Sequence, residues 1–98
     1  MGTQSLVVFY MNGCPHCKAV TGPQSVCREG LDDLVDLYEI EASDSLTQAI
    51  GVTSFPTLVL VNPLFAFAYE GARESEAIRE FVLRKMALTT AYLDAHGV

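Results

Sequence analysis

Two cysteines separated by two residues, in the run Cys14-Pro15-His16-Cys17, have the types and spacing to do chemistry. They follow a β-branched and aromatic run and open a segment of helical composition, which is the context of a redox-active dithiol. At a helix N-terminus, Cys14 would meet unpaired backbone N–H groups that favour its thiolate. Cys17, one turn later, could attack a mixed disulfide formed on Cys14. The motif predicts a reversible dithiol–disulfide pair.

The two residues between the cysteines are expected to tune this chemistry. Pro15 removes one N–H and stiffens the turn, and His16 can place a positive charge beside the Cys14 thiolate. Each unit by which the pKa of Cys14 falls stabilises the reduced, ionised form by about 1.4 kcal/mol. The reduction potential then becomes roughly 30 mV more oxidising. We therefore predict a lowered pKa for Cys14.

Metal binding is the alternative use of such a pair. One motif of this kind supplies half of a zinc site, and Cys27 and His96 lack the spacing of the other half. We therefore predict no metal site, while a metal or iron–sulfur carrier using Cys14 and Cys17 in a dimer stays open as a hypothesis. A redox-silent interaction domain is a third. Cys27 is expected to be a buried apolar residue, with regulation or an intermolecular disulfide as the alternative.

Hydrophobic patterning and turn residues predict seven elements that position this pair. The predicted strands span residues 6–10, 34–41, 57–61 and 64–69. The first predicted helix starts near Cys14-Pro15, is interrupted at Gly22-Pro23 and ends at Gly30. A short helix, with caps in 43–45 and a capping box from Ser45 to Gln48, ends at Gly51, and a long one runs from a cap at Ser75 to Gly97. Its buried face includes Ile78, Phe81, Val82 and Met86.

The predicted order is β-α-β-α-β-β-α over one domain, residues 1–98. A β-α-β start implies a parallel pair of strands joined by a right-handed crossover helix. The Asn62-Pro63 turn makes the last two strands a hairpin. The fold class is therefore α/β, with a four-stranded mixed sheet flanked by helices.

The composition excludes several classes of protein. The chain has 98 residues, 50% hydrophobic and 18% charged, which suits one folded domain. Three cysteines do not make a disulfide scaffold, and a net charge of -6 argues against binding to nucleic acid or an anionic membrane. No apolar stretch reaches the roughly 20 residues of a membrane span, and we find no secretory signal. We expect a compact cytoplasmic protein.

Three segments together resemble the thioredoxin superfamily: V-V-F-Y-M-N-G-C-P-H-C-K (7–18), G-V-T-S-F-P-T-L-V-L-V (51–61) and Y-E-G-A (69–72). The resemblance spans nearly the whole chain and implies a minimal thioredoxin fold. The chain has no counterpart of the first strand and helix of full-length thioredoxins, and in this respect it is similar to the glutaredoxin layout. Pairing C-x-x-C with F-P-T about 40 residues later is specific to this superfamily.

The resemblance assigns a role to each matching residue. Cys14 would be the attacking cysteine and Cys17 the resolving one. Pro56 would be the cis-proline that faces them, and the backbone at Phe55 would pair with an extended substrate. Two basic residues, Lys18 and Arg73, are candidates for binding substrate.

The chain departs from both main branches of the superfamily. Gly13 stands where thioredoxins have tryptophan, and Val8 stands where they have a buried aspartate that helps to deprotonate the resolving cysteine. The glycine pair of glutaredoxins is replaced by the turn 71–73, which weakens a glutathione site. Proline-histidine between the cysteines also occurs in oxidising proteins of the bacterial periplasm, which resemble this chain over four residues only.

The resemblance implies a thiol–disulfide oxidoreductase that reduces protein disulfides and holds no bound cofactor. Its expected partners are a disulfide-containing protein and an electron donor, either an enzyme like the flavin-dependent thioredoxin reductase or glutathione. A glutathione-dependent, glutaredoxin-like activity and an oxidising disulfide donor stay open. We expect a monomer.

Two surface features have no role in this prediction. Seven of the twelve acidic residues lie between Glu29 and Asp44, which we interpret as a solvated face, with a docking surface for a basic partner as the alternative. The last helix continues beyond Lys85 with apolar residues that we expect to cover the domain's own core, with a dimer contact as the alternative. These residues are Ala87, Leu88, Ala91, Tyr92 and Leu93.

Overall fold

The structure is a computed structural model, and it describes residues 4–23, 25–29, 31 and 33–97. The strands are β1 (Ser5–Tyr10), β2 (Asp36–Glu41), β3 (Thr57–Val61) and β4 (Ala66–Tyr69). The helices are a short 3-10 helix η1 (Pro15–Ala19), α1 (Ser45–Ile50) and α2 (Ser75–His96). The order of strands and helices matches the prediction.

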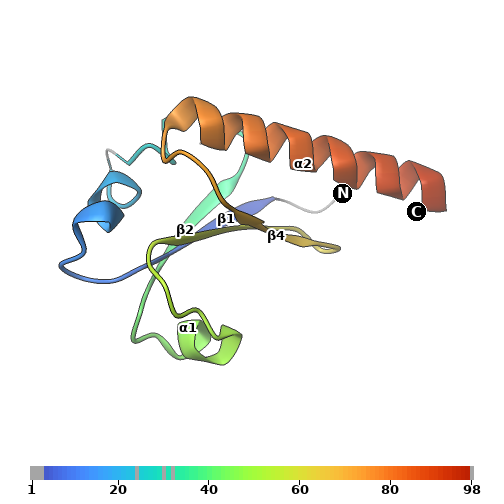
Figure 1. The fold of residues 1–98 in the computed structure, drawn as a ribbon. Coiled ribbons are helices and arrows are strands. Elements are labelled where there is room, and N and C mark those ends of the chain that lie inside the picture. The colour runs from blue at the N-terminus through green and yellow to red at the C-terminus, as the bar shows by residue number, and fades with distance from the viewer. Residues whose placement is uncertain (1–3, 24, 30, 32, 98) are drawn as a thin grey trace.

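The four strands form one mixed sheet in the order β2-β1-β3-β4. β1 is parallel to β2, and β3 is antiparallel to both β1 and β4. α2 lies along one face of this sheet and α1 lies on the other (Figure 1). This arrangement confirms the predicted α/β class and the minimal thioredoxin fold.

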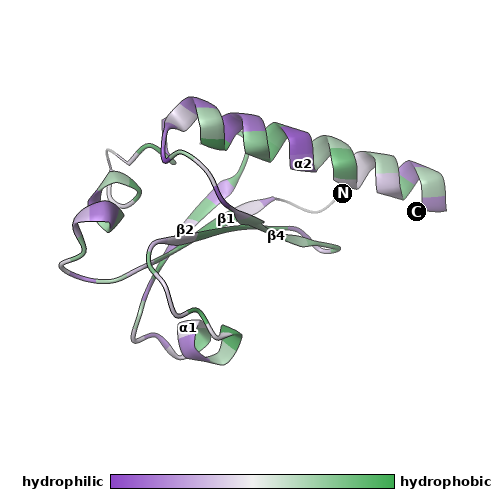
Figure 2. Ribbon diagram, viewed as in Figure 1, coloured by the Kyte–Doolittle hydropathy of each residue, from purple (hydrophilic) through white to green (hydrophobic). Residues whose placement is uncertain are grey.

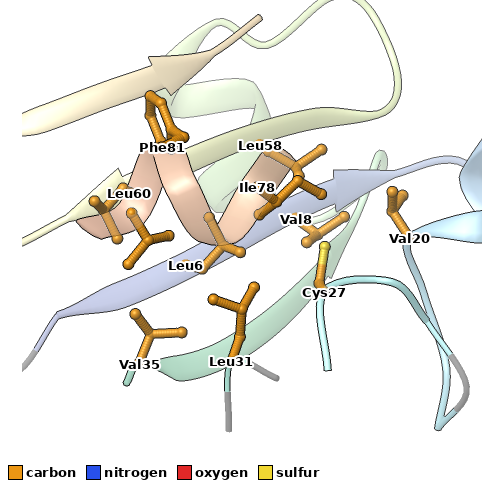
Figure 3. Close-up of a cluster of buried hydrophobic side chains, with 11 residues drawn as sticks. Leu6, Val8, Val20, Cys27, Leu31, Val35, Leu58, Leu60, Ile78 and Phe81 are labelled. Carbon is orange, nitrogen blue, oxygen red and sulfur yellow. The ribbon is translucent and has the colours of Figure 1, made fainter. Parts of the chain in front are cut away.

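The hydrophobic core fills the space between the sheet and α2. Alternate residues of β1 and β3 point into it, because successive side chains of a strand face opposite sides. In Figure 2 the strands are mostly green and α2 shows alternating bands, as expected for a helix with one buried side. Figure 3 shows the cluster, which contains Leu6, Val8, Val20, Cys27, Leu31, Val35, Leu58, Leu60, Ile78, Phe81 and Val82.

The first predicted helix is much shorter than expected. It ends at Ala19, and turns follow it, so the prediction of helix after Gly22-Pro23 was wrong. Gly22 adopts a φ of +84°, a left-handed conformation that a helix cannot continue through, and Pro23 follows it. The predicted end at Gly30 lies outside the described residues.

Two further predicted boundaries were wrong by two residues each. β2 starts at Asp36 because the N–H groups of Leu34 and Val35 donate to the Leu31 carbonyl in a turn. β4 starts at Ala66 because the side-chain oxygen of Asn62 accepts from Leu64 N and Phe65 N. The strand at Thr57–Val61 is as predicted.

The N-terminal caps of α1 and α2 also differ slightly from the prediction. Asp44, one of the predicted candidates, caps α1 by accepting from Leu46 N at 2.9 Å, and the predicted Ser45–Gln48 box does not form. Ser75 is the first residue of α2, and the capping position is Glu74. Both helices end at glycines in the left-handed conformation, Gly51 and Gly97, as predicted.

The C-terminal part of α2 does not cover the core as expected. Ala87, Leu88, Ala91 and Tyr92 are exposed, because these turns extend beyond the sheet (Figure 1). Only Thr89 is fully buried there, and its hydroxyl accepts from the side-chain amide of Asn62. Tyr92 packs edge-on against Phe65. Among the described residues, no helix combines the length and hydropathy needed to cross a membrane.

Candidate active site

Three loops meet at one end of the sheet. Phe9 pairs with Thr57 across β1 and β3, and Leu58 pairs with Tyr69 across β3 and β4. The loop after β1, the loop before β3 and the loop after β4 therefore emerge together, which is seen at the left of Figure 1. They carry the cysteine pair, Pro56 and Arg73, so the fold brings these predicted residues to one edge.

Cys14 and Cys17 have opposite exposure within one turn. Cys14 is the residue before η1, with its own N–H bonded to the Met11 carbonyl at 3.2 Å, and it is half-buried. Cys17 lies inside η1 and is only 2% exposed. The N–H of Cys17 donates to the Cys14 carbonyl at 3.2 Å, and both thiols are free. The pair thus presents one sulfur to solvent and keeps the other behind it.

The pKa of Cys14 is lowered from its ordinary value. The main cause is the hydrogen bond that the Cys17 thiol donates to the Cys14 sulfur. Backbone N–H groups of Cys17 and His16 and the positive charge of Arg73 act in the same direction, while burial opposes them. The direction agrees with the prediction, but the main cause is the neighbouring thiol.

The pKa of Cys17 is raised from its ordinary value. Burial is the main cause, and the Cys14 sulfur adds to it, while a backbone hydrogen bond from Met11 opposes it. Cys17 therefore keeps its proton while Cys14 ionises first. This is the division expected for a nucleophile and a second thiol that acts after it.

The residues beside the cysteines are solvent-exposed. Pro15 occupies the first position of η1, as predicted from its fixed φ. The His16 backbone contributes to the lowered pKa of Cys14, whereas its imidazole and the Lys18 ammonium extend from exposed positions. Tuning by the His16 ring and substrate binding by Lys18 stay predictions.

A groove of about 420 Å³ is lined by Pro56 and Arg73, together with Ser54, Thr57, Leu58, Ala68, Tyr69, Glu70 and Gly71. The Phe55–Pro56 peptide bond is cis, as the resemblance implies. Arg73 lowers the pKa of both Cys14 and Cys17 through its charge. Arg73 thus lines the groove and also acts on both sulfurs through its charge, because screening by solvent limits such an effect to nearby groups.

Sequence reasoning missed Thr21. Its hydroxyl donates to the Cys17 carbonyl at 2.8 Å, and Val20 N donates to the same oxygen at 3.1 Å. These two contacts hold Cys17 from its C-terminal side. A threonine four residues after Cys17 is the signal that was available, since such hydroxyls commonly bond the carbonyl four residues back.

Cys27 lies in a turn and not late in a helix, yet it is fully buried in the core beside Val8 and Val20 (Figure 3). Burial raises the pKa of Cys27 to about 11, with the negative charge of Glu39 adding to the effect. A thiol of this kind stays protonated at neutral pH, and it behaves as the apolar residue that the sequence predicted.

The acidic stretch makes specific contacts inside the molecule. Glu39 pairs with Arg28 at 3.6 Å, and Asp33 pairs with Arg79 at 3.8 Å. Asp44 caps α1, as described above. The stretch therefore combines solvated positions, such as the exposed Asp36, with local structural roles. Among the described residues, no group of three or more His, Cys, Asp or Glu side chains gathers in a way that could hold a metal ion.

Comparison with known proteins matches the Thioredoxin family model to residues 2–84. The chain is 30% identical over 84 residues to protein disulfide-isomerase like 2-2 of Arabidopsis thaliana, covering 83% of this chain and 19% of that protein. It is 31% identical over 97 residues to protein disulfide-isomerase A2 of Pongo abelii, covering 91% and 18%. The chain thus spans about a fifth of the length of these curated relatives.

Solved structures show the same similarity. The J-Trx1 fragment of ERdj5 superposes with a TM-score of 0.72 at 28% identity, covering 86% of this chain and 43% of that one. Chloroplastic thioredoxin z has a TM-score of 0.70 at 23% identity, covering 87% and 80%, and supports the fold alone. With a family match over most of its length, the chain belongs to the thioredoxin family.

Proposed function

We propose that this chain is a thiol–disulfide oxidoreductase that cycles Cys14 and Cys17 between dithiol and disulfide to reduce protein disulfides. The observation that carries this proposal is that one turn holds a half-buried Cys14, whose pKa is lowered, and a buried Cys17, whose pKa is raised. This arrangement favours a thiolate on the accessible residue and keeps the second thiol within reach. The relatives named as protein disulfide-isomerases support a protein disulfide as the substrate class.

The reaction follows from the two environments. The Cys14 thiolate attacks one sulfur of the substrate disulfide, an S–S bond forms to Cys14, and the other substrate sulfur leaves as a thiolate. Cys17 then loses its proton and attacks the Cys14 sulfur, which releases the second substrate thiolate. The substrate gains two electrons, and Cys14 and Cys17 are left as a disulfide.

The groove beside Pro56 is the proposed seat of the substrate chain. Its lining includes Thr57 and Leu58 at the start of β3, and an extended peptide lying there could pair with the backbone at Phe55. Arg73 lies in this groove and can pair with a carboxylate near the substrate cysteine. With these two assignments, the proposed site includes residues that bind the substrate peptide as well as the two cysteines that react with its disulfide.

Trapping with a Cys17→Ser variant tests the mechanism, because Cys14 can then form a mixed disulfide that is not resolved. We expect a stable adduct with a disulfide-containing protein such as insulin, and none with Cys14→Ser. An adduct chiefly with glutathione from a mixture of both would favour the glutaredoxin-like alternative. Absence of any adduct on Cys14 would refute the proposed function.

The direction of the cycle needs a separate measurement. A lowered pKa of Cys14 stabilises the reduced pair, which makes the pair a better oxidant. Titration of Cys14 and Cys17 against a glutathione buffer gives the reduction potential directly. We expect the reduction potential of the cysteine pair to be more negative than that of a physiological glutathione pool, as a reductase needs. A strongly oxidising value would instead assign a disulfide donor.

A further inference from the structure

Two charged residues hold the backbone of Gly22, which lies just after η1: one contacts its N–H and the other its carbonyl. Gly22 N donates to a carboxylate oxygen of Glu39 at 2.8 Å, and Arg28 Nε donates to the Gly22 carbonyl at 3.0 Å. Arg28 Nη2 lies 3.6 Å from that same Glu39 oxygen. Glu39, Arg28 and Gly22 therefore close a small ring of contacts, which we call the Gly22 clamp.

The clamp is directly connected to the resolving cysteine. Gly22 follows Val20 and Thr21, the two residues that donate to the Cys17 carbonyl. Gly22 adopts a left-handed conformation, with φ +84°, that fixes the direction in which the chain leaves this contact. Anchoring Gly22 to β2 therefore anchors the C-terminal side of Cys17 to the sheet.

Glu39 lies in β2, and its side chain contacts Gly22 from the sheet. It is the parallel register partner of Val8, and paired residues of parallel strands point to the same side of the sheet. The Glu39 side chain is 23% exposed, and its charge acts on buried Cys27. A partly buried carboxylate needs partners, and here they are the Gly22 N–H and Arg28.

We infer that Glu39 and Arg28 are positioning residues that set the redox properties of Cys14 and Cys17 by fixing where the Cys17 thiol lies. This inference rests on the proposed function. The thiol of Cys17 stabilises the Cys14 sulfur through one hydrogen bond, and such bonds weaken steeply with distance and angle. Loosening the clamp would let Cys17 move and would weaken the thiolate on Cys14.

The sign of the effect separates positioning from simple electrostatics. Removing the negative charge of Glu39 would, by charge alone, favour the Cys14 thiolate and make the pair more oxidising. Losing the clamp would weaken the hydrogen bond from Cys17 and make the pair more reducing. Glu39→Gln removes the charge but keeps an oxygen that can accept from Gly22 N, whereas Glu39→Ala removes both.

The experiment compares the glutathione equilibrium constant and the rate of Cys14 alkylation at pH 7 for the wild type, Glu39→Ala and Glu39→Gln. For Glu39→Ala we expect a more reducing pair by about three- to tenfold in the equilibrium constant, or roughly 15–30 mV, with slower alkylation. Glu39→Gln should lie at the wild-type value or on its oxidising side. A more oxidising Glu39→Ala, or one equal to the wild type, would overturn the inference.

Val35→Ala is the control for lost stability. Val35 is a core residue just before β2, and its N–H donates to the Leu31 carbonyl, outside the active-site segment. It should lower the melting temperature and leave the potential unchanged; an equal shift in potential would assign Glu39 a merely structural role. If Glu39→Ala does not fold, Arg28→Met takes its place, measured at high salt to screen the charge left on Glu39. It should also become more reducing, and no change would overturn the inference.

The outcome stays distinct from that of the proposed function. If wild-type Cys14 and Cys17 do not exchange with glutathione, the proposed function fails before any clamp variant is compared. If the wild type exchanges and Glu39→Ala behaves identically, only the clamp is refuted.

Discussion

The two faces of the sheet are built differently. On one face, side chains of β1 and β3 such as Leu6 and Leu60 are fully buried against α2 and the turns after η1. On the other face, α1 leaves an apolar groove of about 580 Å³. Its lining includes Tyr38, which is 52% exposed, and Ile50 of α1, which is 58% exposed. In the described part of the chain, the hydrophobic cluster therefore lies on one face, while the groove face combines exposed apolar side chains with the buried Phe9.

The segment that follows the reactive pair packs into the face that holds this cluster. Val20, three residues after the buried Cys17, and Cys27 both belong to the hydrophobic cluster. Well-packed interiors transmit small displacements, because side chains have no free space to absorb them. The geometry of the two sulfurs should therefore respond to substitutions on this face and be nearly indifferent to substitutions on the groove face.

Adjacent residues of β3 give the largest test of this contrast. Leu60 is fully buried against α2, whereas Val59 faces the groove. We expect Leu60→Ala to lower the free energy of unfolding by about 2–5 kcal/mol, and Val59→Ala by about 1 kcal/mol. Urea unfolding monitored by circular dichroism measures both. Equal losses would show that the groove face is packed as tightly as the core.

Cys27 gives the next effect, through pH. Its pKa is raised to about 11 in the folded protein, whereas an unfolded cysteine ionises near 8.5. The contribution of Cys27 to stability is thus fully present below about pH 8.5 and is lost as pH rises from there to about 11, by about 3 kcal/mol in all. Unfolding should be measured on the oxidised protein, in which Cys14 and Cys17 do not titrate.

Cys27→Ala is the variant that isolates this effect. The raised pKa of Tyr69 adds its own alkaline dependence, but that is common to both proteins. The difference between wild type and Cys27→Ala should therefore change between pH 8.5 and 11. A constant difference over that range would mean that Cys27 is not held in the apolar core.

The sequence predicted the packed face better than the groove face. The apolar positions of the last helix were sufficient to predict that Ile78, Phe81 and Val82 are buried and that Met86 packs against them. Local patterns predicted the interruption at Gly22-Pro23, but they could not show that turns would replace the helix after it, or that the last turns of α2 would extend beyond the sheet. Those outcomes depend on tertiary geometry, which no short window contains.

The site shows the same division. The cysteine spacing was enough to predict a nucleophile and a second thiol, and F-P-T pointed to the cis-proline. The contacts of Thr21, Arg28 and Glu39 were not predicted, because they join segments that are 4, 6 and 17 residues apart through a turn. The charge run around Glu39 looked like a solvated face for the same reason.

A smaller effect is expected at the site itself, in the ionisation of Cys14. Because the Cys17 thiol is the main cause of the lowered pKa, Cys17→Ala should raise the pKa of Cys14, and Cys17→Ser, which keeps a hydroxyl donor, should raise it less. Alkylation of Cys14 as a function of pH gives each midpoint, and at pH 7 we expect Cys17→Ala to react several-fold more slowly than Cys17→Ser. Identical midpoints would assign the shift to the backbone N–H groups and Arg73.

The smallest effect is expected for Tyr38→Thr on the groove face. Tyr38 is half exposed on edge strand β2, and threonine, like tyrosine, is favoured in strands, so the free energy of unfolding should change by about 0.5 kcal/mol or less. Its neighbour Glu39 points to the opposite side, where it holds Gly22. The potential of the cysteine pair should therefore be unchanged in Tyr38→Thr. A shift in potential comparable to that of Glu39→Ala would show that β2 transmits displacement through its backbone, and the two faces would then have to be treated as one coupled unit.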